Sequence, residues 1–451
     1  MTIFIPIFQG VEARNILRTD IFKTLRQQND LRIVLFVTSQ DRKEYFEKEF
    51  FGQNIVYEVA PFYRSPAFQW FFGFLKFNLI NTKTIDLKRR IQLEQDGNRL
   101  KYFSKFLINR LFANKFFRKT IRTLDYLLVK DDNYREYFDK YRPDMVFLAH
   151  LFSDTEISFL RQAKKMGIKS VGLINSWDKI TSRCMVRLLP DKLIVNNNIV
   201  KGEAMKFVDM AEEGIEVVGI PHYDIYFNKK SSREDFAGRL GFSPEKKLVV
   251  FAPWGKERSD ADKDLIKLLY RILNKDLVHL NSQLLVRFPP NDVVELSPDL
   301  AGKNIIYQRP GHKFAKERGV DWDMNFEDLQ ELMDTLYHGN LVISFTSSIA
   351  IDAALFEKPV INVKFDSRPS DSSLRRPSRF YDTDHYSKLL ATGGVRLVHN
   401  EQELIHWIKS YLENSNLHSA ERKRIVDEQC WKHDGRAGFR AANFILNYLN
   451  Q

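Results

Sequence analysis

The chain has 451 residues, which is enough for two domains that each bury their own core. Its composition, with 44% hydrophobic and 28% charged residues, is that of a globular protein, and two cysteines are too few for a disulfide framework. The formal charge of +11 comes with no zinc finger, basic zipper or RNA-binding aromatic motif, so we expect no nucleic-acid partner. The first residues lack a secretory signal and no apolar run approaches 18 residues, which predicts a cytoplasmic protein that is soluble or peripheral to a membrane.

The amino-terminal part alternates strand and helix patterns. Residues 2–8 form an apolar strand-like run, residues 15–25 repeat apolar side chains at helical spacing, and residues 31–38 form a second strand-like run. Strand patterns return at 145–149, 170–174, 193–196 and 216–219. This rhythm predicts a doubly wound α/β domain over residues 1–227.

A basic and aromatic helical insertion, at about residues 68–130, interrupts that rhythm. The window from Lys76 to Arg122 holds thirteen Lys/Arg and three Asp/Glu, a net charge of +10, so the remainder of the chain is close to neutral. Bulky apolar side chains such as Phe103 and Phe116 alternate there with cations such as Lys101 and Lys119. Such a helix can lie in an anionic membrane interface, at the inner face of the plasma membrane. The alternative is a buried helical hairpin whose cations form a solvated face.

The second half repeats the architecture without repeating the sequence. A segment rich in Lys, Ser and Gly, residues 228–247, is expected to link the domains. A second Rossmann-like domain is predicted over residues 248–435, with strand patterns at 248–252, 283–288, 305–307, 341–345 and 360–363, followed by a helix over 436–451.

The most informative stretch runs from Leu341 to Val363. A buried strand leads into Thr346, Ser347 and Ser348, then into a helix pattern that carries Asp352, then into the next strand. The N–H groups and hydroxyls at that helix start can bind a phosphate, and Asp352 can accept hydrogen bonds from a ribose. The alternative is that the hydroxyls only cap the helix.

Ligands of open parallel sheets bind outside the carboxyl ends of the strands, so the residues that follow each strand are candidates. In the second half these are Pro253, Trp254, Arg287 and the Thr346–Ser348 turn, which suit a nucleotide diphosphate. In the first half carboxylates and a histidine follow the strands and suit a general base that activates a hydroxyl: Glu12, His150, Asp154 and Asp178. His150 could instead be a packed, hydrogen-bonded residue.

Several motifs resemble one enzyme group. FEDLQELMDTLYHGNLVISFTSSIAIDAALFEKPVI, residues 326–361, resembles the carboxyl-terminal signature of GT-B-type glycosyltransferases. GIPHYD, residues 219–224, is similar to a Gly-x-Pro-x-x-Asp element that ends the first domain of CDP-glycerol glycerophosphotransferases, nucleotide-sugar 2-epimerases and capsule-type sugar transferases. NSWDKITS, residues 175–182, and the tail from 384 to 436 resemble bacterial surface-polysaccharide glycosyltransferases.

The resemblance implies the α/β GT-B fold, with two Rossmann-like doubly wound domains that face a central cleft. It also implies that Ser347, Ser348 and His385 hold the donor phosphates, next to Thr346, while Asp352 takes the ribose. Arg287 or the Pro253–Trp254 loop would then flank the nucleotide. The Arg287–Pro290 segment departs from the family, since relatives often have a His-Pro pair there.

The function that the resemblance implies is transfer of a sugar from a nucleotide-activated donor to a glycan or lipid-linked acceptor of a surface polysaccharide, without a metal. Asp178 is the first candidate for the base, followed by Asp154, His150 and Glu12. Three alternatives remain open: a polyol-phosphate transferase that uses a CDP-linked donor, a nucleotide-sugar 2-epimerase, and a non-catalytic nucleotide-binding relative. The sequence predicts neither the sugar nor the oligomeric state.

Overall fold

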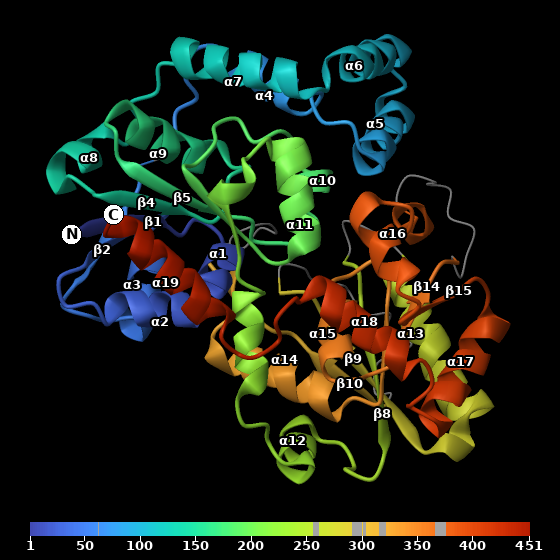
Figure 1. The fold of residues 1–451 in the computed structure, drawn as a ribbon. Helices are drawn as coiled ribbons and strands as arrows, with labels where there is room; N and C mark the ends of the chain where they lie inside the picture. Colours follow the sequence, from blue (N-terminus) through green and yellow to red (C-terminus); the bar gives the residue numbers. More distant parts are fainter. Residues whose placement is uncertain (62, 256–260, 291–299, 301–303, 315–321, 366–375) are drawn as a thin grey trace. The chain divides into compact units, whose positions relative to one another are not determined.

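A computed structural model describes residues 1–451 except 62, 256–260, 291–299, 301–303, 315–321 and 366–375 (Figure 1). The chain divides into two compact units. Unit 1 contains Met1–Asp224 and Cys430–Gln451, and unit 2 contains Ile225–Gln429. The segment expected to be a linker, residues 228–247, includes a helix of unit 2, α12 (Arg233–Leu240).

Unit 1 is built on a seven-stranded parallel sheet with the order β3-β2-β1-β4-β5-β6-β7. Its strands are nearly continuous apolar runs, as expected for strands covered on both faces. The strands are β1 (Thr2–Pro6), β2 (Arg32–Val37), β3 (Ile55–Val59), β4 (Met145–Leu148), β5 (Lys169–Leu173), β6 (Lys192–Val195) and β7 (Ile215–Val217).

Helices cover both faces of this sheet, and each face has its own hydrophobic cluster. One face packs against α1 (Gly10–Asn15), α2 (Asp20–Arg26), α3 (Gln40–Glu49) and α19 (Ala437–Leu449). The other packs against α8 (Arg135–Tyr141), α9 (Asp154–Lys165) and α11 (Asn198–Glu203), and the short α10 (Lys179–Ser182) follows β5. The doubly wound domain predicted from the alternating pattern is therefore present.

Residues 68–130 form four helices, which Figure 1 shows grouped at the end of unit 1 away from α2 and α3. They are α4 (Gln69–Lys76), α5 (Lys83–Asp96), α6 (Arg99–Phe112) and α7 (Lys115–Leu128). Buried polar contacts hold them together and to the sheet. The Asn109 side chain donates to the carbonyls of Asn78 and Ile80, and Arg118 and Arg122 both pair with Asp209 at 2.6 Å.

Unit 2 is built on a six-stranded parallel sheet with the order β10-β9-β8-β13-β14-β15. The strands are β8 (Lys247–Ala252), β9 (Ser282–Arg287), β10 (Ile305–Gln308), β13 (Leu341–Ser344), β14 (Val360–Val363) and β15 (Val395–Val398), and β11 (His312–Lys313) pairs with β12 (Trp322–Asp323) apart from them. The helices are α13 (Ala261–Arg271), α14 (Phe326–His338), α15 (Ile349–Leu355), α16 (Asp384–Ala391), α17 (Glu401–Glu413) and α18 (Ser419–Gln429).

The GIPHYD motif fastens α19 to unit 1. The Asp224 carboxylate accepts from the backbone N–H groups of Ala437 and Gly438, at 3.1 and 2.7 Å, so it satisfies two N–H groups at the start of α19. Gly219 has φ +94°, and a Cβ there would lie 3.2 Å from the carbonyl oxygen of Lys432. The glycine and the aspartate of this motif therefore have a structural role.

Candidate functional site

The strand order of each sheet reverses at one point, between β1 and β4 in unit 1 and between β8 and β13 in unit 2. Ligands of doubly wound sheets bind outside the carboxyl ends of the strands at such switch points. Glu12 and His150 follow β1 and β4, whereas Trp254 and the Thr346–Ser348 turn follow β8 and β13. Predicted residues of both kinds, for the base and for the donor, thus lie at the two switch points.

At the switch point of unit 1, three buried side chains meet: Glu12, His150 and Glu156. Glu12 Oε1 lies 3.4 Å from His150 Nδ1, while Glu12 Oε2 accepts from the N–H of Gln9 at 2.9 Å. Glu156 Oε2 accepts from the backbone N–H of His150 at 2.7 Å. Burial, and then the charge of Glu12, raise the pKa of Glu156 well above its ordinary value. The surroundings of Glu156 thus favour its neutral, protonated form.

His150 is mostly neutral in this setting. Burial lowers its pKa, and the contact with Glu12 offsets only part of that effect. One ligand atom from each of Glu12, His150 and Glu156 lies within 4.8 Å of the others, a spacing that a divalent cation could also use. Metal-independent chemistry therefore stays a prediction.

Asp178 follows β5 and immediately precedes α10. Its carboxylate accepts from the hydroxyls of Ser176 and Ser182, the second at 3.1 Å, and its side chain is only half-buried. The next residue, Lys179, is buried, and burial followed by the charge of Arg183 lowers the pKa of its amine to about 8. Asp178 therefore combines two oriented hydrogen bonds with access from solvent, as a general base requires.

Asp154, the second candidate base, is held in an ion-pair network. Its carboxylate pairs with Lys76 at 2.7 Å and with Arg187 at 3.2 Å. Burial acts to raise the pKa of Asp154, but the two cations outweigh it and leave the pKa below its usual value. A carboxylate with a lowered pKa is a weaker base, so these contacts count against Asp154 as the general base.

At the switch point of unit 2, the turn after β13 meets the start of α16. The backbone N–H of Ser347 donates to the hydroxyl of Tyr386 at 3.4 Å, and that hydroxyl bonds to Asn362 and to the Phe345 carbonyl. Because Tyr386 is buried in the first turn of α16, it brings the preceding residue, His385, to this region of the unit. Ser348 is exposed and starts α15.

Asp352, predicted to bind a ribose, is buried in α15 and accepts a hydrogen bond from the hydroxyl of Tyr226. A ribose would have to share or replace that contact. Sequence reasoning could not foresee it, because Tyr226 lies 126 positions earlier in the chain.

Arg287 and Trp254, predicted to flank the nucleotide, are packed into unit 2. The Arg287 guanidinium pairs with Glu331 at 2.9 Å and donates to Gln308 and to the Asp328 carbonyl. Trp254 is 9% exposed and its ring packs on Phe380. Pro253 is buried as well. These contacts compete with a nucleotide, so the Thr346–Ser348 turn and His385 are the stronger part of the predicted donor site.

Glu156 is the main residue that sequence reasoning missed. Helical spacing places it on the same face of α9 as Phe159, Leu160 and Ala163, all of which are buried. A glutamate on an apolar helix face that follows a strand end is a recognisable signal of a buried polar site.

Two doubly wound parallel-sheet units, each with polar residues at its switch point, define the class of two-domain GT-B transferases. Residues 162–447 match the family model of CDP-glycerol:poly(glycerophosphate) glycerophosphotransferases, and the chain belongs to this family. The match contains Asp178 and every predicted donor-site residue, whereas Glu12, His150 and Asp154 precede it.

Similar proteins include a curated relative and two solved structures. The chain is 22% identical over 213 residues to the teichoic acid glycerol-phosphate primase of Bacillus spizizenii, in a match that covers 45% of this chain and 48% of the relative. The matched region thus spans about half the length of this curated relative. The fold of this chain resembles that of S. aureus MnaA in a structure with UDP (TM-score 0.54, 13% identity, covering 100% of this chain and 97% of MnaA). It also resembles that of the wall teichoic acid polymerase TagF with CDPG (TM-score 0.51, 13% identity, 100% and 89%).

Proposed function

We propose that the chain transfers a phosphorylated polyol from a CDP-linked donor to an acceptor hydroxyl in the synthesis of a cell-wall polymer such as teichoic acid. The family match over residues 162–447 carries this proposal. It favours the polyol phosphate over the sugar that the polysaccharide motifs first suggested, and sugar transfer from a nucleotide sugar is the second candidate.

The proposed chemistry needs a base and a site for the leaving group. The acceptor oxygen attacks the phosphorus that carries the polyol, the P–O–P bond breaks, and CMP leaves while the hydroxyl proton passes to the base. We assign the base to Asp178, whose half-exposed carboxylate is oriented by Ser176 and Ser182. Donor phosphates would lie at Ser347, Ser348 and His385, where N–H and hydroxyl donors stabilise the charge that accumulates on the leaving phosphate.

The nucleotide released distinguishes the candidates. Transfer of a polyol phosphate from CDP-glycerol releases CMP, because the P–O–P bond breaks. Transfer of a sugar breaks a C–O bond and releases a nucleoside diphosphate, whereas an epimerase releases no nucleotide. We expect CMP, measured by chromatography after incubation with CDP-glycerol and a lipid-linked acceptor. Release of UDP from UDP-sugars with no CMP from CDP-glycerol would favour the second candidate. If neither nucleotide is released and no nucleotide raises the melting temperature, the proposal is wrong.

We also propose that the helices of residues 68–130 dock on an anionic membrane and hold the enzyme near a lipid-linked acceptor. None of the helices in the described ranges is both long and apolar enough to cross a bilayer. Apolar side chains on α4, α6 and α7 are nevertheless strongly exposed: Trp70 77%, Leu100 82%, Phe103 62%, Leu107 58%, Leu111 55%, Phe116 71% and Leu127 65%. Those on α6 follow helical spacing and form one stripe, as in helices that lie in a membrane interface.

Not every cation of this segment is available to lipid. Lys76, Arg118 and Arg122 are buried in ion pairs with Asp154 and Asp209, so they are structural. Lys101, Lys115 and Lys119 are exposed and lie on the same helices as the apolar side chains. The net charge counted from the sequence therefore overestimates the positive charge that can face a membrane.

Replacing Lys101, Lys115 and Lys119 together by Gln is expected to weaken binding to anionic vesicles by up to about 100-fold at low salt, since each cation contributes about 1 kcal/mol near such a surface. Flotation assays measure this. The control replaces the exposed Lys23, Arg26 and Lys48, which lie outside the insertion, and should bind as the parent does. Equal loss in the two triple variants would contradict docking through these helices.

Trp70→Ser should also weaken binding to the vesicles, whereas the control Phe51→Ser, which removes an exposed ring outside the insertion, should not.

A further inference from the structure

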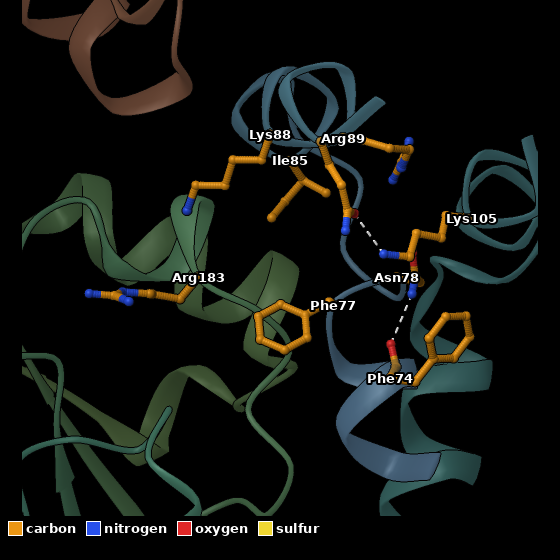
Figure 2. Close-up of a pocket in the computed structure, with 9 residues that line it drawn as sticks. Phe74, Phe77, Asn78, Ile85, Lys88, Arg89, Lys105 and Arg183 are labelled. Carbon is orange, nitrogen blue, oxygen red and sulfur yellow. Dashed lines mark hydrogen bonds between the residues drawn. The ribbon is translucent and has the colours of Figure 1, made fainter. Parts of the chain in front are cut away.

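A cavity of about 330 Å³ lies inside the helical insertion, between α4, α5, α6 and the segment that follows α10. It is lined by Phe74, Phe77, Asn78, Ile85, Lys88, Arg89, Gln92, Lys105 and Arg183. Figure 2 shows Lys88 and Arg183 on one side, Arg89 and Lys105 on the other, and the ring of Phe77 between them. The volume is near the lower end of the range for small-molecule sites, about 300–1,000 Å³.

Among the described residues, four cations and no carboxylate line this cavity. Burial, and then the charges of Lys101 and Arg89, lower the pKa of Lys105, while Asp96 acts to raise it. Arg183 is exposed, and its side chain has no ion-pair or hydrogen-bond partner among the residues that the structure describes. A bound anion would reduce the repulsion among these like charges.

Arg89 is an independent indication of a ligand. Its side chain is 4% exposed; one terminal nitrogen pairs with Asp86 at 2.9 Å, but the other, Nη2, is buried without a hydrogen-bond partner in the described part of the chain. A buried donor of a charged group that is left unpaired is unfavourable, because nothing compensates for the water that it has lost. A phosphate oxygen would satisfy this donor and the neighbouring Lys105, whose present acceptor is the neutral amide of Gln92 at 2.7 Å.

The apolar lining indicates what is attached to the anion. Phe74 and Phe77 are 39% and 53% exposed; Phe74 lies in α4 and Phe77 directly follows its last residue. The cavity thus joins a cationic interior to the apolar surface that we propose for membrane docking. A ligand with a phosphate head and an apolar tail matches both parts, whereas free phosphate matches only the first.

We propose that this cavity binds the phosphate headgroup of a membrane lipid, with the lipid tail along Phe74 and Phe77. The assignment rests on the proposed function, since a lipid-linked acceptor would present such a phosphate at the insertion. It differs from general docking because it requires a preference among anionic lipids. Guanidinium and ammonium groups form charge-assisted hydrogen bonds with a phosphomonoester, which offers more charge and more free oxygens than a phosphodiester.

The test uses the full chain and two kinds of vesicle matched in surface charge, one with phosphatidic acid and one with phosphatidylglycerol. We expect about tenfold tighter binding to phosphatidic acid, a ratio that one additional charge-assisted contact provides. The variant Lys105→Gln/Arg183→Gln should lower this ratio to about one. The matched control, Lys83→Gln/Arg90→Gln, removes two exposed cations of α5 that do not line the cavity, and it should keep the ratio.

Each other outcome overturns the assignment. A ratio near one in the parent protein, or the same loss of ratio in both double variants, would show that the cavity does not select a headgroup. Competition by inorganic phosphate at the same concentration as soluble dihexanoyl phosphatidic acid would show a free-anion site instead. The single variant Arg183→Gln changes an exposed side chain and should therefore fold normally. It should lower the ratio of binding to phosphatidic acid over phosphatidylglycerol in part. Protection by nucleotides is measured in parallel: its loss in the parent protein would refute the transferase proposal, whereas the headgroup ratio would be unaffected.

Discussion

Replacement of Asp178 by Asn is expected to lower the rate of transfer by about 10²–10⁴-fold, the usual contribution of a general base. The amide can keep a hydrogen bond from Ser176 or Ser182 but cannot accept the proton of the acceptor hydroxyl. The side chains differ little in size, so the fold and nucleotide binding should be unchanged. Single-turnover transfer with a saturating donor measures the chemical step, and the nucleotide-dependent rise in melting temperature checks the donor site.

The other candidate bases provide the comparison. Asp154→Asn should mainly lower the stability of the fold, because it breaks the ion pairs with Lys76 and Arg187, and it should have the smaller effect on the rate of transfer. Glu12→Gln and His150→Gln alter a buried cluster and should change the rate less than Asp178→Asn. A variant of Asp178 that keeps most of its activity, beside an inactive variant of His150, would move the base to the switch point of unit 1.

Replacement of Asp125 by Asn is expected to lower the free energy of unfolding of unit 1 by about 3–5 kcal/mol, the cost of breaking a buried ion pair from one side. Asp125 is 0% exposed and lies in α7. Arg187 donates to its carboxylate at 2.6 and 2.9 Å, and Arg161 binds both the carboxylate and the backbone carbonyl. The variant leaves two buried guanidinium groups without this counter-charge, which is why the expected loss is large.

For a domain of this size the loss corresponds to a melting temperature lower by about 6–20 °C. Scanning calorimetry resolves it, and the transition of unit 2 serves as the internal reference. Asp139→Asn is the control, because its partner Arg135 is 63% exposed and such surface pairs contribute little. Equal shifts in both variants would mean that the Asp125 cluster does not support the attachment of α7.

The sequence predicted the two doubly wound sheets because parallel strands are apolar throughout and helices are periodic, both of which are local signals. It also predicted which residues follow each strand, and Glu12 and His150 do meet. It did not predict the direction of the side chains: Arg287 ends β9 as expected, but the side chain points to Glu331 and Gln308. Contacts between distant segments, such as Tyr226 with Asp352, depend on how helices dock and leave no local pattern.

The charge of the helical insertion, residues 68–130, shows the same limit. Composition gave a net charge of +10 between Lys76 and Arg122, yet it could not separate solvated cations from those that bind Asp209 or Asp154. Conversely, the four cations around the 330 Å³ cavity come from α5, α6 and the segment after α10, nearly 100 residues apart, so no sequence window contains them together.

The attachment of α19 through Asp224 makes unit 1 discontinuous, while unit 2 is one uninterrupted segment, Ile225–Gln429. A ribosome therefore delivers every residue of unit 2 before it delivers α19. Because domains generally fold as units during synthesis, the order of folding should be the reverse of the order in the chain, with the carboxyl-terminal sheet complete first. The amino-terminal sheet would meanwhile expose the surface that α19 later covers, which makes it the part of the nascent chain most in need of a chaperone.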